Sequence, residues 1–144
     1  VKGEPQWDNT TPWIAWGHLH TGGMWFKKAS VIAKENGKTD AAELKKAAHN
    51  GLDYVTKPHF DTPPSNNKIK QGEPIKRSQY FFLPAMGRYE EGTFSEFGAN
   101  GRYWTSTLVS YNKAVAYSLY FNSGYVAVSN TIKRQNGLRP WTSE

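Results

Sequence analysis

Apolar and polar residues alternate most regularly in the last third of the chain, and this pattern predicts strands. In VAYSLYF, residues 115–121, one parity carries the large apolar side chains and the other the smaller or hydroxyl-bearing ones: Val115, Tyr117, Leu119 and Phe121 against Ala116, Ser118 and Tyr120. Successive side chains of a strand point to opposite faces, so we expect the first set to face a core. NSG at 122–124 predicts a three-residue hairpin loop, and Val126 and Val128 are expected to face inward on the returning strand.

Shorter strand signals occur elsewhere. YFFLPAM at 80–86, closed by Gly87, and RYWTSTLV at 102–109 are rich in aromatic and β-branched residues. NGLRPW at 136–141 predicts a turn followed by a closing strand segment. In residues 5–25, PQWDNTTPWIAWGHLHTGGMW, proline, glycine and threonine interrupt the apolar positions, which favours short extended pieces.

Two segments have helical spacing. The first spans residues 25–36, where the apolar positions are Phe26, Ala29, Ile32 and Ala33, and Asn36 with Gly37 supplies a left-handed stop. In the second, Asp40 can cap, Glu43 follows three residues later, and one face is lined by Leu44, Ala47, Ala48, Gly51 and Leu52. Residues 57–78 hold four of the eight prolines, and we expect a long surface loop there.

Length and composition bound the architecture. The 144 residues suit a single domain over 1–144, and the 15% aromatic content predicts a core built on Trp, Tyr and Phe. No apolar run is long enough for a transmembrane segment. The chain starts at Val1 without a basic and apolar leader, so we expect a mature or trimmed chain. The absence of cysteine excludes disulfides, thiolate nucleophiles and cysteine-based metal sites.

The net charge of the chain and the distribution of its basic residues indicate which classes of binding partner to expect. The formal net charge is +6, yet the lysines are dispersed over the predicted helices as on a solvated surface. No aromatic-flanked basic motif of a nucleic-acid reader is present, so no nucleic-acid partner is expected. Strong salt sensitivity of binding would instead reveal an anionic polysaccharide or nucleic acid bound by basic residues of the tail: Arg102, Lys113, Lys133 and Arg134.

Candidate catalytic and metal-binding residues are few. His18 and His20 would share one face of a strand, and His49 or His59 could complete a zinc site. The alternative is that these histidines are exposed or hydrogen-bonded near aromatic side chains. The only acidic cluster, Glu90, Glu91 and Glu96, could supply the carboxylate pair of a glycosidase or could lie in a polar loop. No phosphate loop or nucleophile elbow is present.

The tail resembles a known family. YFFLPAMG, GRYWTST, AYSLYFNSGYVAVSN and NGLRPW, in this order over residues 80–141, resemble the Fibrobacter succinogenes major paralogous domain and related C-terminal domains of fimbrillin-like surface proteins. The resemblance implies an α+β domain of C-type-lectin-like fold, with two helices and a small, mostly antiparallel sheet. It also implies an extracellular location on the bacterial cell surface.

Two departures from that group limit what it implies. Formylglycine-generating relatives depend on an active-site cysteine pair, and this chain has no cysteine. Calcium-dependent sugar binders of the lectin-like fold use carboxylates in their C-terminal half, whereas residues 97–143 contain no Asp or Glu. Calcium sites need charged oxygen ligands, so we expect no calcium site of that kind and no cofactor.

The same acid-free tail holds five of the eight tyrosines. Tyrosine gives large rigid contact area with a polar tip, and serine, asparagine and glycine adapt hydrogen bonds, as in antibody loops. In variable lectin-like relatives the ligand-contacting residues fall in this region. The predicted ligand-binding residues are Tyr103, Ser110, Tyr111, Asn112, Ser118, Tyr120, Asn122, Tyr125, Ser129 and Asn130. Alternatively, Tyr120 and Tyr125 pair across the hairpin only to stabilise it.

These observations favour a non-catalytic recognition or adhesion module that binds a protein or glycan without calcium, as part of a longer surface protein. Two other classes stay open. A structural fimbrial or scaffold subunit would show exposed apolar area or a free strand edge. An enzyme related to the formylglycine-generating group, with residues 57–78 as a lid, would show a pocket with perturbed titratable groups.

Overall fold

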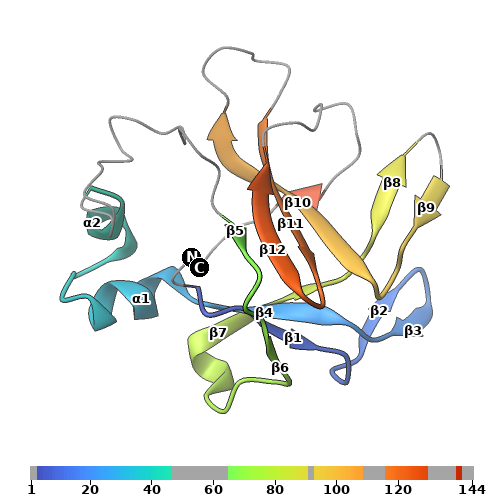
Figure 1. Cartoon of the computed structure of the whole chain (residues 1–144), viewed down its shortest axis with the longest axis horizontal. Coiled ribbons are helices and arrows are strands. Elements are labelled where there is room, and N and C mark those ends of the chain that lie inside the picture. Colours follow the sequence, from blue (N-terminus) through green and yellow to red (C-terminus); the bar gives the residue numbers. More distant parts are fainter. Residues whose placement is uncertain (1–2, 47–64, 91–92, 109–115, 130–138, 141–144) are drawn as a thin grey trace.

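The computed structural model describes residues 3–46, 65–90, 93–108, 116–129 and 139–140, and strands dominate them (Figure 1). The first half contains strands β1 (Gln6–Asp8), β2 (Trp13–Ala15), β3 (His18–His20) and β4 (Gly23–Lys27), then helices α1 (Ala29–Glu35) and α2 (Ala41–Lys46). Next come β5 (Ser65–Asn66), β6 (Lys70–Gln71), a 3-10 turn η1 (Arg77–Gln79), β7 (Tyr80–Pro84), β8 (Arg88–Glu90) and β9 (Thr93–Ser95). The last strands are β10 (Asn100–Leu108), β11 (Ala116–Asn122), β12 (Tyr125–Ser129) and β13 (Arg139–Pro140).

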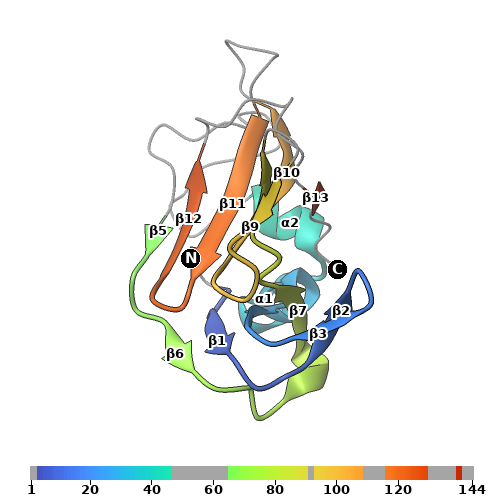
Figure 2. The ribbon, with the colours of Figure 1, turned by 90° about the vertical axis from the view of Figure 1, so that its right-hand side faces the viewer.

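The strands form two main sheets. The first has the order β6-β1-β4-β7, with β6 parallel to β1 and the other pairs antiparallel. The second has the order β13-β10-β11-β12-β5, with β13 parallel to β10 and the other pairs antiparallel, and Figure 2 shows these strands side by side. Two separate hairpins, β2–β3 and β8–β9, lie at the opposite end of the molecule from the helices (Figure 1).

Both sheets contribute to one core, whose centre is Phe121 of β11. The Phe121 ring lies 6.1 Å from the rings of Phe26 and Tyr103 and 6.4 Å from Trp7. Gly101 is directly opposite Phe121 in the β10–β11 register, and a Cβ on Gly101 would lie 2.3 Å from the Phe121 ring. The missing side chain of Gly101 therefore makes room for the central ring. The buried cluster comprises Trp7, Met24, Phe26, Ala85, Tyr103, Leu119, Phe121 and Val126.

The segment after β7 joins the two sheets. Ala85 N–H donates to Gly22 O and Gly87 N–H donates to Asn100 O, at 2.9 and 2.7 Å. The Tyr103 hydroxyl donates to Pro84 O at 2.6 Å, so β10 of one sheet is tied to the end of β7 of the other. These bonds satisfy main-chain groups that strand pairing leaves free.

The expected C-type-lectin-like α+β fold is wrong for this chain. The described residues are rich in strands, which lie in several sheets rather than in one small sheet, and the two helices among them span only seven and six residues. Residues 57–78 were expected to be a loop, but Ser65–Asn66 and Lys70–Gln71 are edge strands that extend one sheet each. Residues 57–64 lie outside the described part of the chain.

The first predicted helix begins too early. Residues 23–27 form β4, the strand between β1 and β7, and all five are buried. Pairing on both edges overrides the helical spacing, and α1 starts only after Lys28, whose backbone is extended. The predicted stop is confirmed, because Gly37 has φ of +69° and Lys38 N–H donates to Ala33 O.

The capping signal of the second helix is confirmed. Glu43 N–H donates to the Asp40 carboxylate at 2.9 Å, and the Glu43 carboxylate accepts from Thr39 N–H at 3.1 Å. The predicted continuation of this helix beyond residue 46 lies outside the described residues.

The strands predicted near 80–86 and 102–109, the short N-terminal strands and the closing strand are present as β7, β10, β1 to β4 and β13. Of the inward residues predicted for 115–121, Leu119 and Phe121 are buried in the core as expected, while Ser118 of the other parity is buried as well. Val115 lies outside the described residues. The hairpin loop has two residues rather than three, because Asn122 pairs with Tyr125.

Candidate functional site

The face of β10, β11 and β12 that points away from the core carries a cluster of aromatic and polar side chains. Arg102 pairs with Tyr120 across β10 and β11, and Asn122 pairs with Tyr125 across β11 and β12. Because Tyr120 and Asn122 are two residues apart on one strand, all four share a face. We call Arg102, Tyr120, Asn122 and Tyr125 the tyrosine surface.

Direct contacts fix these four side chains relative to one another. The Arg102 guanidinium carbon lies 4.7 Å from the Tyr120 ring centroid, and the Tyr120 and Tyr125 rings are 6.4 Å apart and inclined by 51°. The Asn122 amide donates to the Tyr120 hydroxyl at 3.1 Å, and its oxygen accepts from Gly124 N–H at 2.9 Å. A preordered aromatic and amide surface of this kind loses little conformational entropy when it binds a ligand.

The polar groups of this face are not all satisfied internally. Arg102 Nε and Asn100 Oδ1 are shielded from solvent and have no hydrogen-bond partner. Asn100 lies opposite Asn122 in the register and is 7% exposed. Within the described residues, Arg102 also forms no ion pair with a carboxylate. Among the described residues, no carboxylate neutralises the cation that Arg102 places on this face.

Three of the ten predicted ligand-binding residues come together on this surface: Tyr120, Asn122 and Tyr125, the last of which is 38% exposed. Tyr103 instead belongs to the core, stacked against Phe121. Ser118 has the parity of Tyr120 but is fully buried, and the backbone of Ser129 pairs with it. Ser110, Tyr111, Asn112 and Asn130 lie outside the described residues.

Asn100 was not predicted, and Arg102 was outside the ten predicted ligand-binding residues, named only among the basic tail residues that an anionic ligand would contact. The signal that could have found them is strand parity, because both are an odd number of residues from the core residue Tyr103 on β10, the strand that pairs with β11. Tyr103 and Arg102 are adjacent on β10, so their side chains point to opposite faces of the sheet. Amino-acid composition alone grouped Tyr103 with Tyr120 and Tyr125, although the sheet places Tyr103 on the core face.

A second exposed cluster lies on the β2–β3 hairpin. Ile14 and Leu19 are directly opposite each other and are 74% and 70% exposed, and Trp16 in the hairpin turn is 62% exposed. Trp16 and Gly17 have φ of +54° and +74°, the left-handed pair of a tight two-residue turn. We call Ile14, Trp16 and Leu19 the hairpin apolar patch.

The histidines of this hairpin fit the aromatic alternative better than the zinc site. The His20 ring is stacked between Trp13 and Phe97, with centroid distances of 4.8 and 5.2 Å. Across the residues that the structure describes, no three His, Cys, Asp or Glu side chains form a group that could hold a metal ion. His49 and His59, the proposed third ligands, lie outside those residues, as does Glu91 of the acidic cluster.

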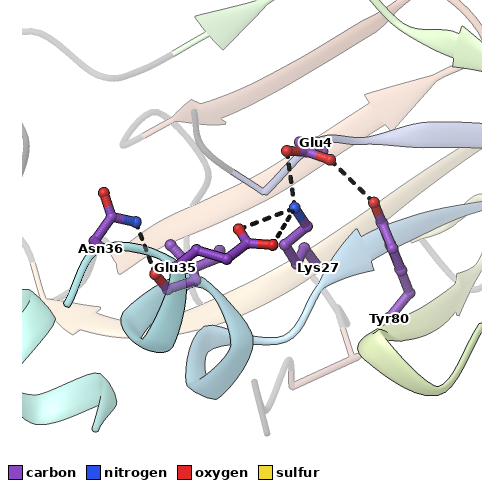
Figure 3. A network of polar contacts seen from close by, with 6 residues as sticks. Glu4, Lys27, Glu35, Asn36 and Tyr80 are labelled. Carbon is purple, nitrogen blue, oxygen red and sulfur yellow. Dashed lines mark hydrogen bonds and ion pairs between the residues drawn. The ribbon is translucent and has the colours of Figure 1, made fainter. Parts of the chain in front are cut away.

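The buried ammonium of Lys27 is engaged in internal contacts (Figure 3). Lys27 forms ion pairs with Glu4 and Glu35, and the Tyr80 hydroxyl donates to Glu4 at 3.1 Å. Burial alone would lower the pKa of Lys27, but its bonds to the two carboxylates outweigh that effect and raise it. Burial, together with the bond to Glu4, raises the pKa of the Tyr80 hydroxyl.

Asp8 is also internally satisfied. It is fully buried, and its carboxylate accepts hydrogen bonds from the backbone and hydroxyl groups of Thr10 and Thr11 and from the indole of Trp25. Burial alone would raise the pKa of Asp8, but the bonds from Thr11, Trp25 and Thr10 together hold it well below its ordinary value. This carboxylate organises the turn after β1 and has no capacity left for a ligand.

Comparisons with known proteins return no match to the chain from family models, from curated proteins or from solved structures. The family resemblance of residues 80–141 therefore stays a prediction. Neither of the two described helices has the length and apolar character needed to span a membrane.

Proposed function

We propose that this protein is a non-catalytic recognition module that binds a protein or glycan through the tyrosine surface, without calcium. Its place as part of a longer protein on the bacterial cell surface belongs to the same proposal and rests on the family resemblance of the tail.

The observation that carries the proposal is the contact set of Tyr120. Its ring is packed between a guanidinium and a second tyrosine, and its hydroxyl is held by Asn122. Aromatic and arginine side chains dominate the binding energy of recognition surfaces when they are rigid and surrounded by polar groups. The contact between Tyr120 and Tyr125 across β11 and β12 can also stabilise the hairpin, and the same residue can both stabilise the sheet and bind a ligand.

The test is a binding screen of the wild type against glycans and host-surface proteins, with calcium and with a chelator. Tyr125→Ala removes the exposed ring, and Ile75→Ala is the control because Ile75 is fully exposed and lies outside the tyrosine surface. We expect the screen to find a ligand whose affinity for Tyr125→Ala is about tenfold lower than for the wild type. Its affinity for Ile75→Ala should be unchanged, and the chelator should not release it. Absence of any ligand, or equal losses in both variants, would contradict the proposal.

The hairpin apolar patch favours a second candidate, a structural subunit of an assembly. Contiguous exposed apolar side chains on a soluble domain often mark contacts with other proteins. Sedimentation of the wild type and of an Ile14→Ser, Leu19→Ser variant would test this. The structural role is supported if the wild type associates as its concentration rises, and if this association is lost in that variant but kept in Ile75→Ser. A wild type that stays monomeric at every concentration excludes self-assembly through the patch.

A further inference from the structure

We propose that the ligand of the tyrosine surface is an acidic glycan containing uronic acid, with Arg102 pairing with the sugar carboxylate and Tyr125 packing against the sugar ring. This inference rests on the proposed function and specifies the chemistry of its ligand.

Charge complementarity is the first argument. Arg102 forms no ion pair with any carboxylate of the described residues. Residues 97–143 contain no Asp or Glu that could compete for it. A guanidinium pairs best with a planar carboxylate, which can accept two parallel hydrogen bonds.

Arg77 is also stacked on an aromatic ring, but unlike Arg102 it has a carboxylate partner among the described residues. Its guanidinium carbon lies 5.1 Å from the Trp25 ring centroid. Its Nε, however, lies 3.6 Å from a carboxylate oxygen of Glu73. Both arginines are therefore held by an aromatic ring, but only Arg102 keeps its charge unpaired within the described part of the chain.

Further positive charge borders the hairpin. β5 pairs with β12, and the Gln71 amide donates to Ser123 O at 2.9 Å, which ties residues 65–71 to the β11–β12 turn. Lys68 and Lys70 of this segment are both exposed. A chain with repeated carboxylates could contact these lysines as well as Arg102.

The form of the surface favours a sugar over an acidic peptide. Main-chain groups of β10, β11 and β12 are used in the sheet ladders, so the face offers side chains only. A peptide bound there would leave its own backbone donors and acceptors without partners, whereas peptides usually bind sheet edges. A sugar ring presents C–H groups to an aromatic ring and hydroxyls to amides such as Asn122.

The experiment measures binding of a short oligogalacturonate and of its carboxyl-reduced, neutral counterpart by calorimetry. The proteins are the wild type, Arg102→Gln, Arg102→Lys, Tyr125→Ala and, as matched control, Arg77→Gln. We expect the wild type to bind the acidic form, and to bind the reduced form with an affinity lower by about tenfold or more. The affinity of Arg102→Gln for the acidic form should fall by a similar factor. Arg102→Lys should recover only part of the loss, and Arg77→Gln should bind normally. Binding should weaken as salt increases.

Other outcomes overturn the inference. Equal binding of the neutral form, or equal losses in the Arg77 and Arg102 variants, would remove the role of the unpaired guanidinium. Tighter binding of a single-stranded oligonucleotide than of the glycan would mean that phosphate is the recognised group. If a protein or neutral glycan binds through Tyr125 without any effect of Arg102→Gln, the inference fails while the proposed function stands. If no ligand class binds, both fail. The comparison of the two glycans on the wild type holds even if an Arg102 variant does not fold.

Discussion

Lys27 Nζ lies 2.8 Å from Glu4 Oε1, although Lys27 is buried in β4 and Glu4 is half-exposed in the segment before β1. The same ammonium lies 3.1 Å from Glu35 at the end of α1 (Figure 3). Lys27 N–H also donates to Gly3 O. One buried cation thus connects the N-terminal segment, the central strand of a sheet and the first helix.

The first prediction follows from the unequal burial of these partners. In Lys27→Met, Glu4 and Glu35 can return to water, so we expect the free energy of unfolding to fall by no more than about 1 kcal/mol. In Glu4→Gln, Glu35→Gln, the buried ammonium loses both counterions, and we expect a larger loss, about 2–3 kcal/mol. Urea unfolding of both variants measures the difference. A greater loss in Lys27→Met would mean that the pair itself, and not burial of an unpaired charge, dominates.

The second prediction concerns acid stability. The bond to Lys27 lowers the pKa of Glu4, and the internal donors lower that of Asp8, from ordinary values of 4.5 and 3.8. A carboxylate with a lowered folded-state pKa stabilises the fold fully above its ordinary pKa, and that contribution is lost as pH falls through the folded value. We therefore expect the free energy of unfolding to fall progressively below about pH 4.5.

Asp8→Asn tests the share of Asp8 in this acid dependence. The variant should be less stable near pH 7 by about 2–4 kcal/mol, because an amide cannot accept all the bonds that the buried carboxylate accepts. Its stability should also fall less steeply in acid. Asp40→Asn, a change at an exposed helix cap, is the control. An unchanged acid slope in Asp8→Asn would show that other groups cause the acid dependence.

The parts of the fold that the sequence predicts are those in which local pattern and tertiary position agree. The alternation of Leu119 and Phe121 with Ser118 and Tyr120 is a property of one strand, and a hairpin brings its neighbour close. The start of the helix expected at residue 25 was wrong because residues up to Lys27 belong to β4, which lies between two strands distant in sequence, β1 and β7. Such pairings leave no local signal.

The candidate site shows the same limit. Tyr120, Asn122 and Tyr125 could be predicted because they are near in sequence and share the parity of one hairpin. Arg102 joins them only through the β10–β11 register, which its neighbours in sequence do not reveal. The same register places Tyr103 in the core, although Tyr103 and Tyr120 are both tyrosines and composition does not distinguish them.

The third prediction tests the room beside Phe121. Gly101→Ala would place a Cβ 2.3 Å from the Phe121 ring, and we expect it to destabilise the protein by about 1–3 kcal/mol through overpacking. Gly124→Ala is the matched control, because a Cβ there meets nothing within 4 Å. Thermal unfolding compares the two. Similar midpoints in both variants would show that the ring can move aside without cost.

The last prediction separates the two tyrosines that composition groups together. Tyr103→Phe removes the 2.6 Å hydrogen bond from the Tyr103 hydroxyl to Pro84 O, which ties β10 to the end of β7, but keeps the ring that stacks on Phe121. We expect a loss of about 1 kcal/mol in the free energy of unfolding and unchanged ligand binding. Tyr125→Ala, at an exposed position, should leave stability within about 0.5 kcal/mol and weaken binding. The decisive measurement is unfolding and ligand titration on the same two preparations. If Tyr103→Phe weakened binding without loss of stability, Tyr103 would have to act at the ligand, against its position in the core.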